Sequence, residues 1–224
     1  MPELPIRPPI RGVAFDLDGL LVNTEELYQD VGSELLRRRG RTFEPDLLDR
    51  MMGRPQQVSL QIMIEWHGLT DTIEALARET GEIFFSLLDT RLEPMPGAVD
   101  LVESLARHGL PRGVATSSGP EFAHDVLSRV GLRDRFGFVL TSADVVHGKP
   151  HPEIYALAAA RLGVVPAEML VLEDSENGCR AAVAAGAVVV AVPGAHSRRH
   201  DFTGARFVAE SLADPRIAAL LAGS

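Results

Sequence analysis

Five short, uninterrupted apolar runs are the feature of this 224-residue chain that most constrains its fold. Each run ends in polar residues, and the five lie at 12–15, 113–115, 138–140, 169–172 and 187–192. Continuous apolar strands of this kind are typical of a parallel sheet that is covered on both faces. The runs therefore predict the buried strands of such a sheet.

Helical patterns precede each of the last four apolar runs. They lie at 99–108, 121–130, 152–162 and 178–185. Strands that alternate with helices are typical of a doubly wound α/β fold. We therefore predict an α/β core with a doubly wound, Rossmann-like parallel sheet.

Residues 23–92 interrupt this alternation, because they show helical periodicity and no convincing strand. Candidate helices lie at about 25–39, 46–51, 56–67 and 71–88. So long a segment does not suit a simple crossover between strands, since such connections are usually short. We therefore predict an inserted α-helical cap domain at 23–92 and a core domain formed by 1–22 and 93–224.

Charge and composition limit the partners and the compartment. The formal net charge of −9 disfavours a nucleic acid polymer, whose binding normally needs a basic face. The longest apolar run, 181–192, is shorter than the roughly 20 residues of a membrane-spanning helix, so no membrane partner is expected. The one cysteine, Cys179, cannot form an internal disulfide, which favours a reducing compartment. We expect a cytoplasmic monomer in which Cys179 is a buried residue and not a nucleophile.

Acidic residues follow the first and the fourth apolar runs. Asp16 and Asp18 are two residues apart, so on an extended chain their carboxylates point the same way and repel unless a cation neutralises them. Glu173 and Asp174 end an apolar strand, and their oxygens suit a hard cation such as Mg²⁺. Taken singly, either pair could instead form a turn or cap the following helix.

Hydroxyl and basic residues follow the second and third runs. The segment Thr116-Ser117-Ser118-Gly119-Pro120 offers hydroxyls and N–H groups at the start of a helix, which is a natural phosphate site. Lys149 precedes Pro150, which restricts its backbone toward an extended conformation, and its ammonium could act as a point charge on an oxyanion. Taken singly, an ordinary helix cap and a surface lysine are the simpler interpretations.

The combination of the four clusters is more specific than any one of them. Ligands of open α/β sheets bind outside the carboxyl ends of the strands, where all four clusters fall. Two acidic pairs, a hydroxyl loop and a lysine are the groups that metal-assisted phosphoryl transfer requires. We therefore predict a magnesium-dependent site for a small phosphorylated metabolite.

These motifs resemble those of the haloacid dehalogenase-like hydrolase superfamily, in the same order and across essentially the whole chain. Asp16-Leu17-Asp18-Gly19-Leu20-Leu21 resembles the first motif, Thr116 the second, Lys149 the third and Glu173-Asp174 the fourth. The helical insert lies where the family places a C1-type cap. The runs 52–53, 115–118 and 147–150 resemble the beta-phosphoglucomutase-like branch, and pseudouridine 5'-phosphatase in particular.

The resemblance implies a mechanism in which Asp16 is the nucleophile and forms an aspartyl-phosphate. Asp18 would protonate the leaving oxygen and then deprotonate the hydrolytic water. Mg²⁺ would be held by the Asp16 carboxylate, the Asp18 main-chain carbonyl and Asp174, with Glu173 in or beside the coordination shell.

The phosphoryl group would be bound by Thr116, Ser117 and Lys149, and Lys149 would also offset the charge on the nucleophile. Two alternatives to a phosphatase of sugar phosphates or nucleotide-like monophosphates stay open: a phosphomutase and a non-catalytic phosphate-binding module. The mutases of this branch carry a lysine and an arginine in the cap where this chain has Met52 and Gln56, so hydrolysis is favoured.

Substrate specificity is expected in the cap, because loops and inserts carry specificity on a rigid scaffold. The candidate specificity residues are Glu25, Tyr28, Gly53, Arg54 and Gln57. The cap is expected to close and open about hinges near 21–24 and 93–97.

Some residues have no assigned role in this chemistry. Asn23 and His151 stand where the family often has aspartate, and their roles stay open. Trp66 and the pair at 84–85 are expected to be packing residues of the cap, and the basic stretch 196–200 is expected to be a solvated loop.

Overall fold

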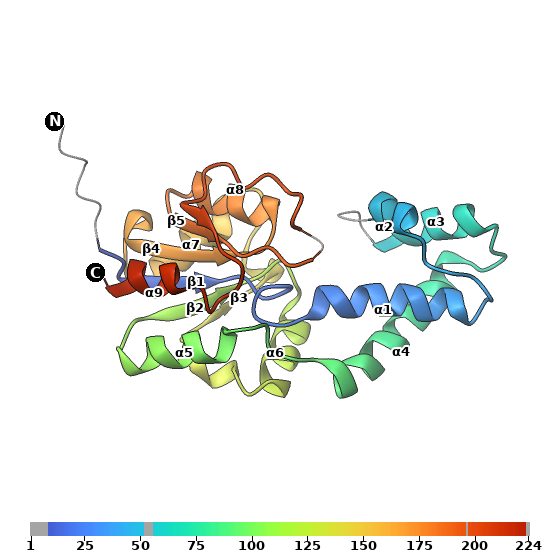
Figure 1. Cartoon of the computed structure of the whole chain (residues 1–224), viewed down its shortest axis with the longest axis horizontal. Helices are drawn as coiled ribbons and strands as arrows, with labels where there is room; N and C mark the ends of the chain where they lie inside the picture. The colour runs from blue at the N-terminus through green and yellow to red at the C-terminus, as the bar shows by residue number, and fades with distance from the viewer. Residues whose placement is uncertain (1–8, 52–55, 196, 223–224) are drawn as a thin grey trace. The chain divides into compact units, whose positions relative to one another are not determined.

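The computed structural model describes residues 9–51, 56–195 and 197–222. The chain divides into two compact units (Figure 1). One unit, here called the core, comprises Met1–Asn23 and Glu93–Ser224, and the other, the cap unit, comprises Thr24–Leu92. Each unit is described by itself.

A six-stranded sheet in the order β3-β2-β1-β4-β5-β6 forms the centre of the core (Figure 1). Every neighbouring pair runs parallel, which confirms the predicted α/β fold class. The strands are β1 (Gly12–Phe15), β2 (Arg112–Ala115), β3 (Val139–Leu140), β4 (Met169–Glu173), β5 (Val188–Ala191) and β6 (Phe207–Val208). Every residue of β1 and β4 is buried, so their uninterrupted apolar sequences match their positions inside the sheet.

Four of the core's helices lie close to the predicted ranges. They are α5 (Ala98–Arg107), α6 (Pro120–Arg129), α7 (Glu153–Leu162) and α8 (Glu176–Ala184). Three 3₁₀ turns lie in the described part of the core. They are η1 (Arg133–Arg135) after α6, η2 (Ser142–Asp144) after β3 and η3 (Pro166–Glu168) after α7. Small alanines of α7 and α8 pack against β1, β2, β4 and β5 in one apolar cluster, which fixes both helices on the sheet.

The sequence prediction missed strand β6 and helix α9 (Pro215–Ala222). Strand β6 has only two residues, one half-buried and one exposed, so it lacks the full burial of the inner strands. Strand β4 is one residue longer than predicted, because the polar residue Glu173 belongs to the strand and is fully buried.

The cap unit contains four helices in its described residues: α1 (Thr24–Arg37), α2 (Pro45–Met51), α3 (Gln56–His67) and α4 (Ile73–Arg91). Helix α1 packs against α4, and Leu36, Leu47 and Met63 form a small buried core. Phe84 is buried as expected, but Trp66 is 38 % and Phe85 58 % exposed, so the prediction that all three are packing residues was wrong. Helical periodicity alone does not say which side of a helix is covered.

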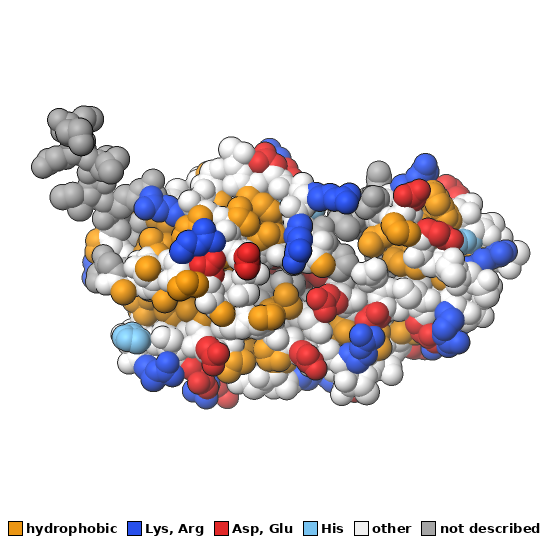
Figure 2. Space-filling model, viewed as in Figure 1, with side chains coloured by type: hydrophobic (Ala, Val, Ile, Leu, Met, Phe, Trp, Pro, Cys, Tyr) orange, Lys and Arg blue, Asp and Glu red, His pale blue; other side chains and the backbone are white. Residues whose placement is uncertain are grey.

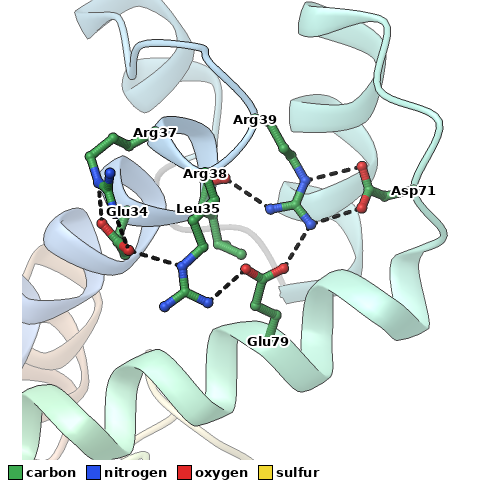
Figure 3. Close-up of polar contacts among 7 residues, drawn as sticks. All are labelled: Glu34, Leu35, Arg37, Arg38, Arg39, Asp71 and Glu79. Atoms are coloured by element: carbon green, nitrogen blue, oxygen red, sulfur yellow. Dashed lines mark hydrogen bonds and ion pairs between the residues drawn. The ribbon is translucent and has the colours of Figure 1, made fainter.

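Arg38 and Arg39, which directly follow α1, join it to α4 through the shared carboxylate of Glu79 (Figure 3). Arg39 donates to both oxygens of Asp71, at 2.8 and 3.0 Å, and to Glu79 at 2.7 Å. Arg38 donates to Glu79 and to Glu34, both at 2.9 Å. Glu79 on α4 therefore holds two arginines of a different segment, a geometry that suits the forked guanidinium group.

The surface and the helices bear on possible partners. On the face shown in Figure 2, acidic and basic side chains are intermingled. No helix in the described part of the chain combines the length and the apolar character that crossing a bilayer needs.

Substituting Glu79→Gln should lower the free energy of unfolding by about 1 kcal/mol, because the half-buried Arg39 and the more exposed Arg38 both lose a charged acceptor. The matched control is Glu34→Gln, whose own partner Arg37 is exposed and whose second partner Arg38 keeps its bond to Glu79, so its effect should be smaller. Urea denaturation of both variants measures the difference. An effect of Glu34→Gln equal to that of Glu79→Gln would contradict the importance of the bridge to α4.

Candidate active site

The carboxyl ends of β1 and β4 bring three acidic residues together. The two strands pair directly, with Phe15 opposite Leu172, and the Asp16 N–H continues the ladder by donating to the Leu172 carbonyl at 3.0 Å. One carboxylate oxygen from each of Asp16, Glu173 and Asp174 lies within 4.8 Å of the others, and all three residues are buried. Asp16 thus meets two residues that follow it in the sequence by 157 and 158 positions, and the three converge on one small volume.

Lys149 reaches into the same volume from the loop before α7. Its ammonium donates to Asp16 Oδ1 at 2.5 Å, to Glu173 Oε1 at 2.7 Å and to the Ala115 carbonyl at 2.9 Å. An ammonium has three N–H donors, so these acceptors use all of them. The Tyr155 ring centroid lies 5.0 Å from Nζ, which adds a cation–π contact.

Glu173 is held by four hydrogen bonds. Its Oε1 accepts from Lys149 Nζ and from the Tyr155 hydroxyl, the latter at 2.8 Å. Its Oε2 accepts from the Ser175 N–H at 3.0 Å and the Ser175 hydroxyl at 2.9 Å. A Cβ on Gly178 would lie 1.6 Å from Glu173 Oε1, so the carboxylate fits only because position 178 has no side chain. The Ser175 hydroxyl also accepts from the Gly178 N–H and thereby caps α8.

Asp18 lies in the loop after β1 and contacts the loop after β2. Its Oδ2 accepts from the Ser118 hydroxyl at 2.6 Å and from the Thr116 hydroxyl at 3.2 Å. Thr116 Oγ1 accepts from the Ser118 N–H, which fixes the two hydroxyls relative to one another. Ser117 was predicted to bind phosphate together with Thr116. Ser117 is exposed, and it is Ser118 that contacts Asp18.

A tight turn connects Asp18 to the linkers between the units. Gly19 has a φ of 74°, a conformation that favours glycine, and its N–H donates to the Val22 carbonyl. Val22 forms bridges to both Asp18 and Pro94. Next to it, the Asn23 N–H donates to the Glu93 carbonyl at 3.1 Å, and Asn23 Oδ1 accepts from the Glu93 N–H at 2.9 Å. The two linkers therefore run side by side, and Asn23 joins them.

Burial and charge together set the pKa values in this cluster. Burial raises the pKa of Asp16 to about 8; the ammonium of Lys149 works against this shift, while the charges of Glu173 and Asp18 add to it. Burial works to lower the pKa of Lys149, but the charges of Asp16 and Glu173 outweigh it and hold the pKa well above its usual value. The ammonium is therefore charged at neutral pH.

The donor set fits a magnesium ion. With Asp16, Glu173 and Asp174 ionised and Lys149 protonated, the buried cluster carries an excess of two negative charges, which a divalent cation would cancel. Carboxylate oxygens are the hard ligands that Mg²⁺ prefers.

The remaining predicted residues lie elsewhere. Glu25, Tyr28 and Gln57 are exposed residues of the cap unit, and the Tyr28 ring stacks on Phe84 with centroids 4.4 Å apart. The other two candidate specificity residues, Gly53 and Arg54, lie outside the described residues, as do Met52 and His196.

Cys179 is buried, as expected. Burial, together with the charges of Glu173 and Asp174, raises the pKa of its thiol, so it is not a reactive thiolate at neutral pH.

Sequence reasoning missed Tyr155 and Gly178, and it included Ser118 in the hydroxyl segment without assigning its contact to Asp18. Ser118 had a usable signal, because it lies two residues after Thr116 and side chains two apart on an extended chain point the same way. Tyr155 and Gly178 occur within helical patterns, and their contacts with Glu173 appear only once the strand and both helices are assembled.

Comparisons with known proteins agree with this geometry. The family model for haloacid dehalogenase-like hydrolases matches residues 13–192. A phosphorylated carbohydrates phosphatase of Thermotoga maritima is 33 % identical over 177 residues, which cover 79 % of this chain and 82 % of that protein. A probable pseudouridine-5'-phosphatase of Drosophila melanogaster is 36 % identical over 208 residues, which cover 89 % of each protein.

A solved structure has the same fold over nearly the whole chain. The crystal structure of a hydrolase of this family from Deinococcus radiodurans, with bound phosphate and sodium, superposes with a TM-score of 0.81 at 27 % identity. The match covers 96 % of this chain and 97 % of that one. The resemblance seen in the four sequence motifs is thereby confirmed: the chain belongs to the haloacid dehalogenase-like hydrolases.

Proposed function

We propose that this hydrolase is a magnesium-dependent phosphatase of small phosphorylated metabolites that works through an aspartyl-phosphate. The observation that carries the proposal is the convergence of Asp16, Asp174 and Lys149 at the ends of neighbouring parallel strands. The phosphatases among its relatives support a phosphoric monoester as the substrate class, with a sugar phosphate or a nucleotide-like monophosphate as the finer proposal.

The proposed magnesium ligands are the carboxylates of Asp16 and Asp174 and the main-chain carbonyl of Asp18. Glu173 is assigned a place beside the ion, because each of its oxygens already accepts two hydrogen bonds. When bound, the ion would neutralise the charge of the carboxylates and of the phosphate, which lets one anion approach another.

Asp16 is the proposed nucleophile. A carboxylate oxygen of Asp16 attacks phosphorus while the bond from phosphorus to the ester oxygen breaks, which leaves a phosphoryl group on Asp16. Lys149 lies 2.5 Å from Asp16 Oδ1 and holds that oxygen in place, so the attacking atom is assigned to the other oxygen, Oδ2. The ammonium also offsets the charge that accumulates on the phosphoryl group.

Asp18 is the proposed general acid and base. It gives a proton to the departing ester oxygen, and it then takes a proton from the water whose oxygen attacks the aspartyl-phosphate and releases orthophosphate. The hydroxyls of Ser118 and Thr116 donate to Oδ2, so the transferred proton is assigned to Oδ1. Thr116, Ser117 and Lys149 are the proposed phosphate-binding residues.

The cap unit is the proposed source of specificity. Its candidate residues Glu25, Tyr28 and Gln57 are exposed, and Gly53 and Arg54 remain predictions. The paired linkers at Val22–Asn23 and Glu93–Pro94 are the proposed hinge. A cytoplasmic location, in keeping with a single buried cysteine, and a monomeric state complete the proposal.

A screen for phosphate release over sugar phosphates, nucleoside monophosphates, phosphoglycolate and pseudouridine 5'-phosphate, each with Mg²⁺, would identify the substrate. Several of these esters should release orthophosphate, with the best substrate distinguished by kcat/KM. Conversion of a sugar 1-phosphate to its 6-phosphate without orthophosphate release would contradict hydrolysis and favour a mutase.

The substitution Asp16→Asn should reduce p-nitrophenyl phosphate hydrolysis by at least roughly a thousandfold, because an amide cannot form the acyl phosphate. Removal of Mg²⁺ with a chelator should have a comparable effect on the unaltered chain. The matched control is Asp100→Asn, at an exposed aspartate of α5, which should keep full activity. Substantial hydrolysis by Asp16→Asn would rule out the nucleophile assignment.

Magnesium binding should release a proton near pH 7. Burial raises the pKa of Asp16 to about 8, so this carboxyl is largely protonated at pH 7 in the metal-free protein, whereas a metal ligand must be a carboxylate. We expect up to one proton to be released per ion at pH 7 and almost none above roughly pH 9. The affinity for Mg²⁺ should rise with pH between these two values. Calorimetry in buffers of different ionisation enthalpy measures the release; a release that does not change with pH would contradict this account.

Tyr155→Phe should keep the ring beside Lys149 but remove the hydroxyl that holds Glu173. We expect kcat to fall by roughly tenfold with a smaller change in KM, and the free energy of unfolding to fall by about 1–2 kcal/mol. The control is Thr80→Val, at a buried hydroxyl with no hydrogen-bond partner among the described residues, which should leave both quantities nearly unchanged. A loss of stability with unchanged kcat would show that Tyr155 only packs.

A further inference from the structure

Two histidines and a glutamate outside the candidate active site lie close together where the loop before α7 meets the helix. His147 and His151 are exposed, and Glu153 is the first residue of the helix. The two imidazole rings have centroids 4.6 Å apart, and one ligand atom from each of the three residues lies within 4.8 Å of the others. The proposed phosphatase reaction uses none of these side chains.

Glu153 Oε2 is the atom on which the two histidines converge. His147 Nδ1 lies 3.0 Å from it and His151 Nδ1 lies 3.7 Å from it. Ligands about 2.0–2.1 Å from a tetrahedral zinc ion are separated from one another by roughly 3.3 Å. The two measured separations lie on either side of that value, so small side-chain rotations would bring both nitrogens into coordination.

The carboxylate of Glu153 is already fixed by the backbone. Oε1 accepts from the Val146 N–H at 2.8 Å, and Oε2 accepts from the His147 N–H at 3.0 Å. A ligand that is ordered before the ion arrives loses little conformational entropy on binding. This preorganisation distinguishes the cluster from a chance meeting of three mobile surface side chains.

We propose that His147, His151 and Glu153 form a binding site for a divalent transition-metal ion such as Zn²⁺. The ion would take two imidazole Nδ1 atoms and one carboxylate oxygen, with water completing its coordination. Imidazole nitrogens favour zinc, nickel or copper, whereas an all-oxygen set favours Mg²⁺, so this site differs in chemistry from the one at Asp16 and Asp174.

Binding exchanges weak contacts for metal bonds. His147 Nδ1 lies 3.0 Å from Glu153 Oε2, and to bind the ion the neutral imidazole carries its single proton on Nε2, so that the Nδ1 lone pair faces the ion. His151 Nδ1 accepts from the Glu153 N–H at 3.3 Å and gives up that long contact. Both contacts are exposed to water, so losing them costs little.

Calorimetric titration of the full, untagged chain with Zn²⁺, in millimolar Mg²⁺, tests the site. We expect about one ion per chain, with a dissociation constant in the micromolar range. His147→Gln and His151→Gln should each weaken zinc binding at least tenfold. The matched control His108→Gln, at an exposed histidine at the end of α5, should leave the affinity unchanged.

A further variant separates this site from the carboxylate cluster. Zinc binding that disappears in Asp174→Asn but persists in His151→Gln would overturn the proposal, and so would the absence of binding at tens of micromolar Zn²⁺. The inference does not rest on the proposed phosphatase function. Phosphate release by both histidine variants with Mg²⁺ alone should match the unaltered chain, so failure of the phosphatase proposal would show in that assay and failure of the zinc site in the titration.

Discussion

An ammonium group buried between two carboxylates is the interaction on which the arrangement of the site depends. Lys149 joins the loop after β1, through Asp16, to the end of β2, through the Ala115 carbonyl, and to β4, through Glu173. Charges at this depth are costly unless they are paired and hydrogen-bonded, so each partner needs the other two. The same contacts that satisfy Lys149 also orient the carboxylate proposed to attack phosphorus.

Much of this arrangement could be predicted from the sequence, because strand burial and sheet topology leave strong signals. The apolar runs are uninterrupted where strands are covered on both faces, and the polar residues that follow them must gather at one edge of a parallel sheet. Asp16, Lys149, Glu173 and Asp174 therefore could be placed together before any coordinates were known. The ranges of α5, α6, α7 and α8 followed from their periodicity.

Other features depend on contacts between distant side chains, for which a sequence pattern carries no information. The Tyr155 hydroxyl holds Glu173, and Gly178 leaves room for the Glu173 carboxylate. Both facts follow only from how α7, α8 and β4 pack together. The edge strand β6 is only partly covered, so its two residues do not carry the signal of a buried strand. The exposure of Phe85 was mispredicted because an aromatic residue in a helix can either pack against a neighbouring helix or face solvent.

The double pairing of Val22 has a mechanical consequence. This residue bridges Asp18 on one side and Pro94 on the other, and its carbonyl accepts from the Gly19 N–H. A displacement of either linker would therefore shift the turn that carries Asp18, because only three residues, 19–21, separate Asp18 from Val22. The proposed proton donor is thus held by the same backbone contacts that fix the two linkers, so its position depends on theirs.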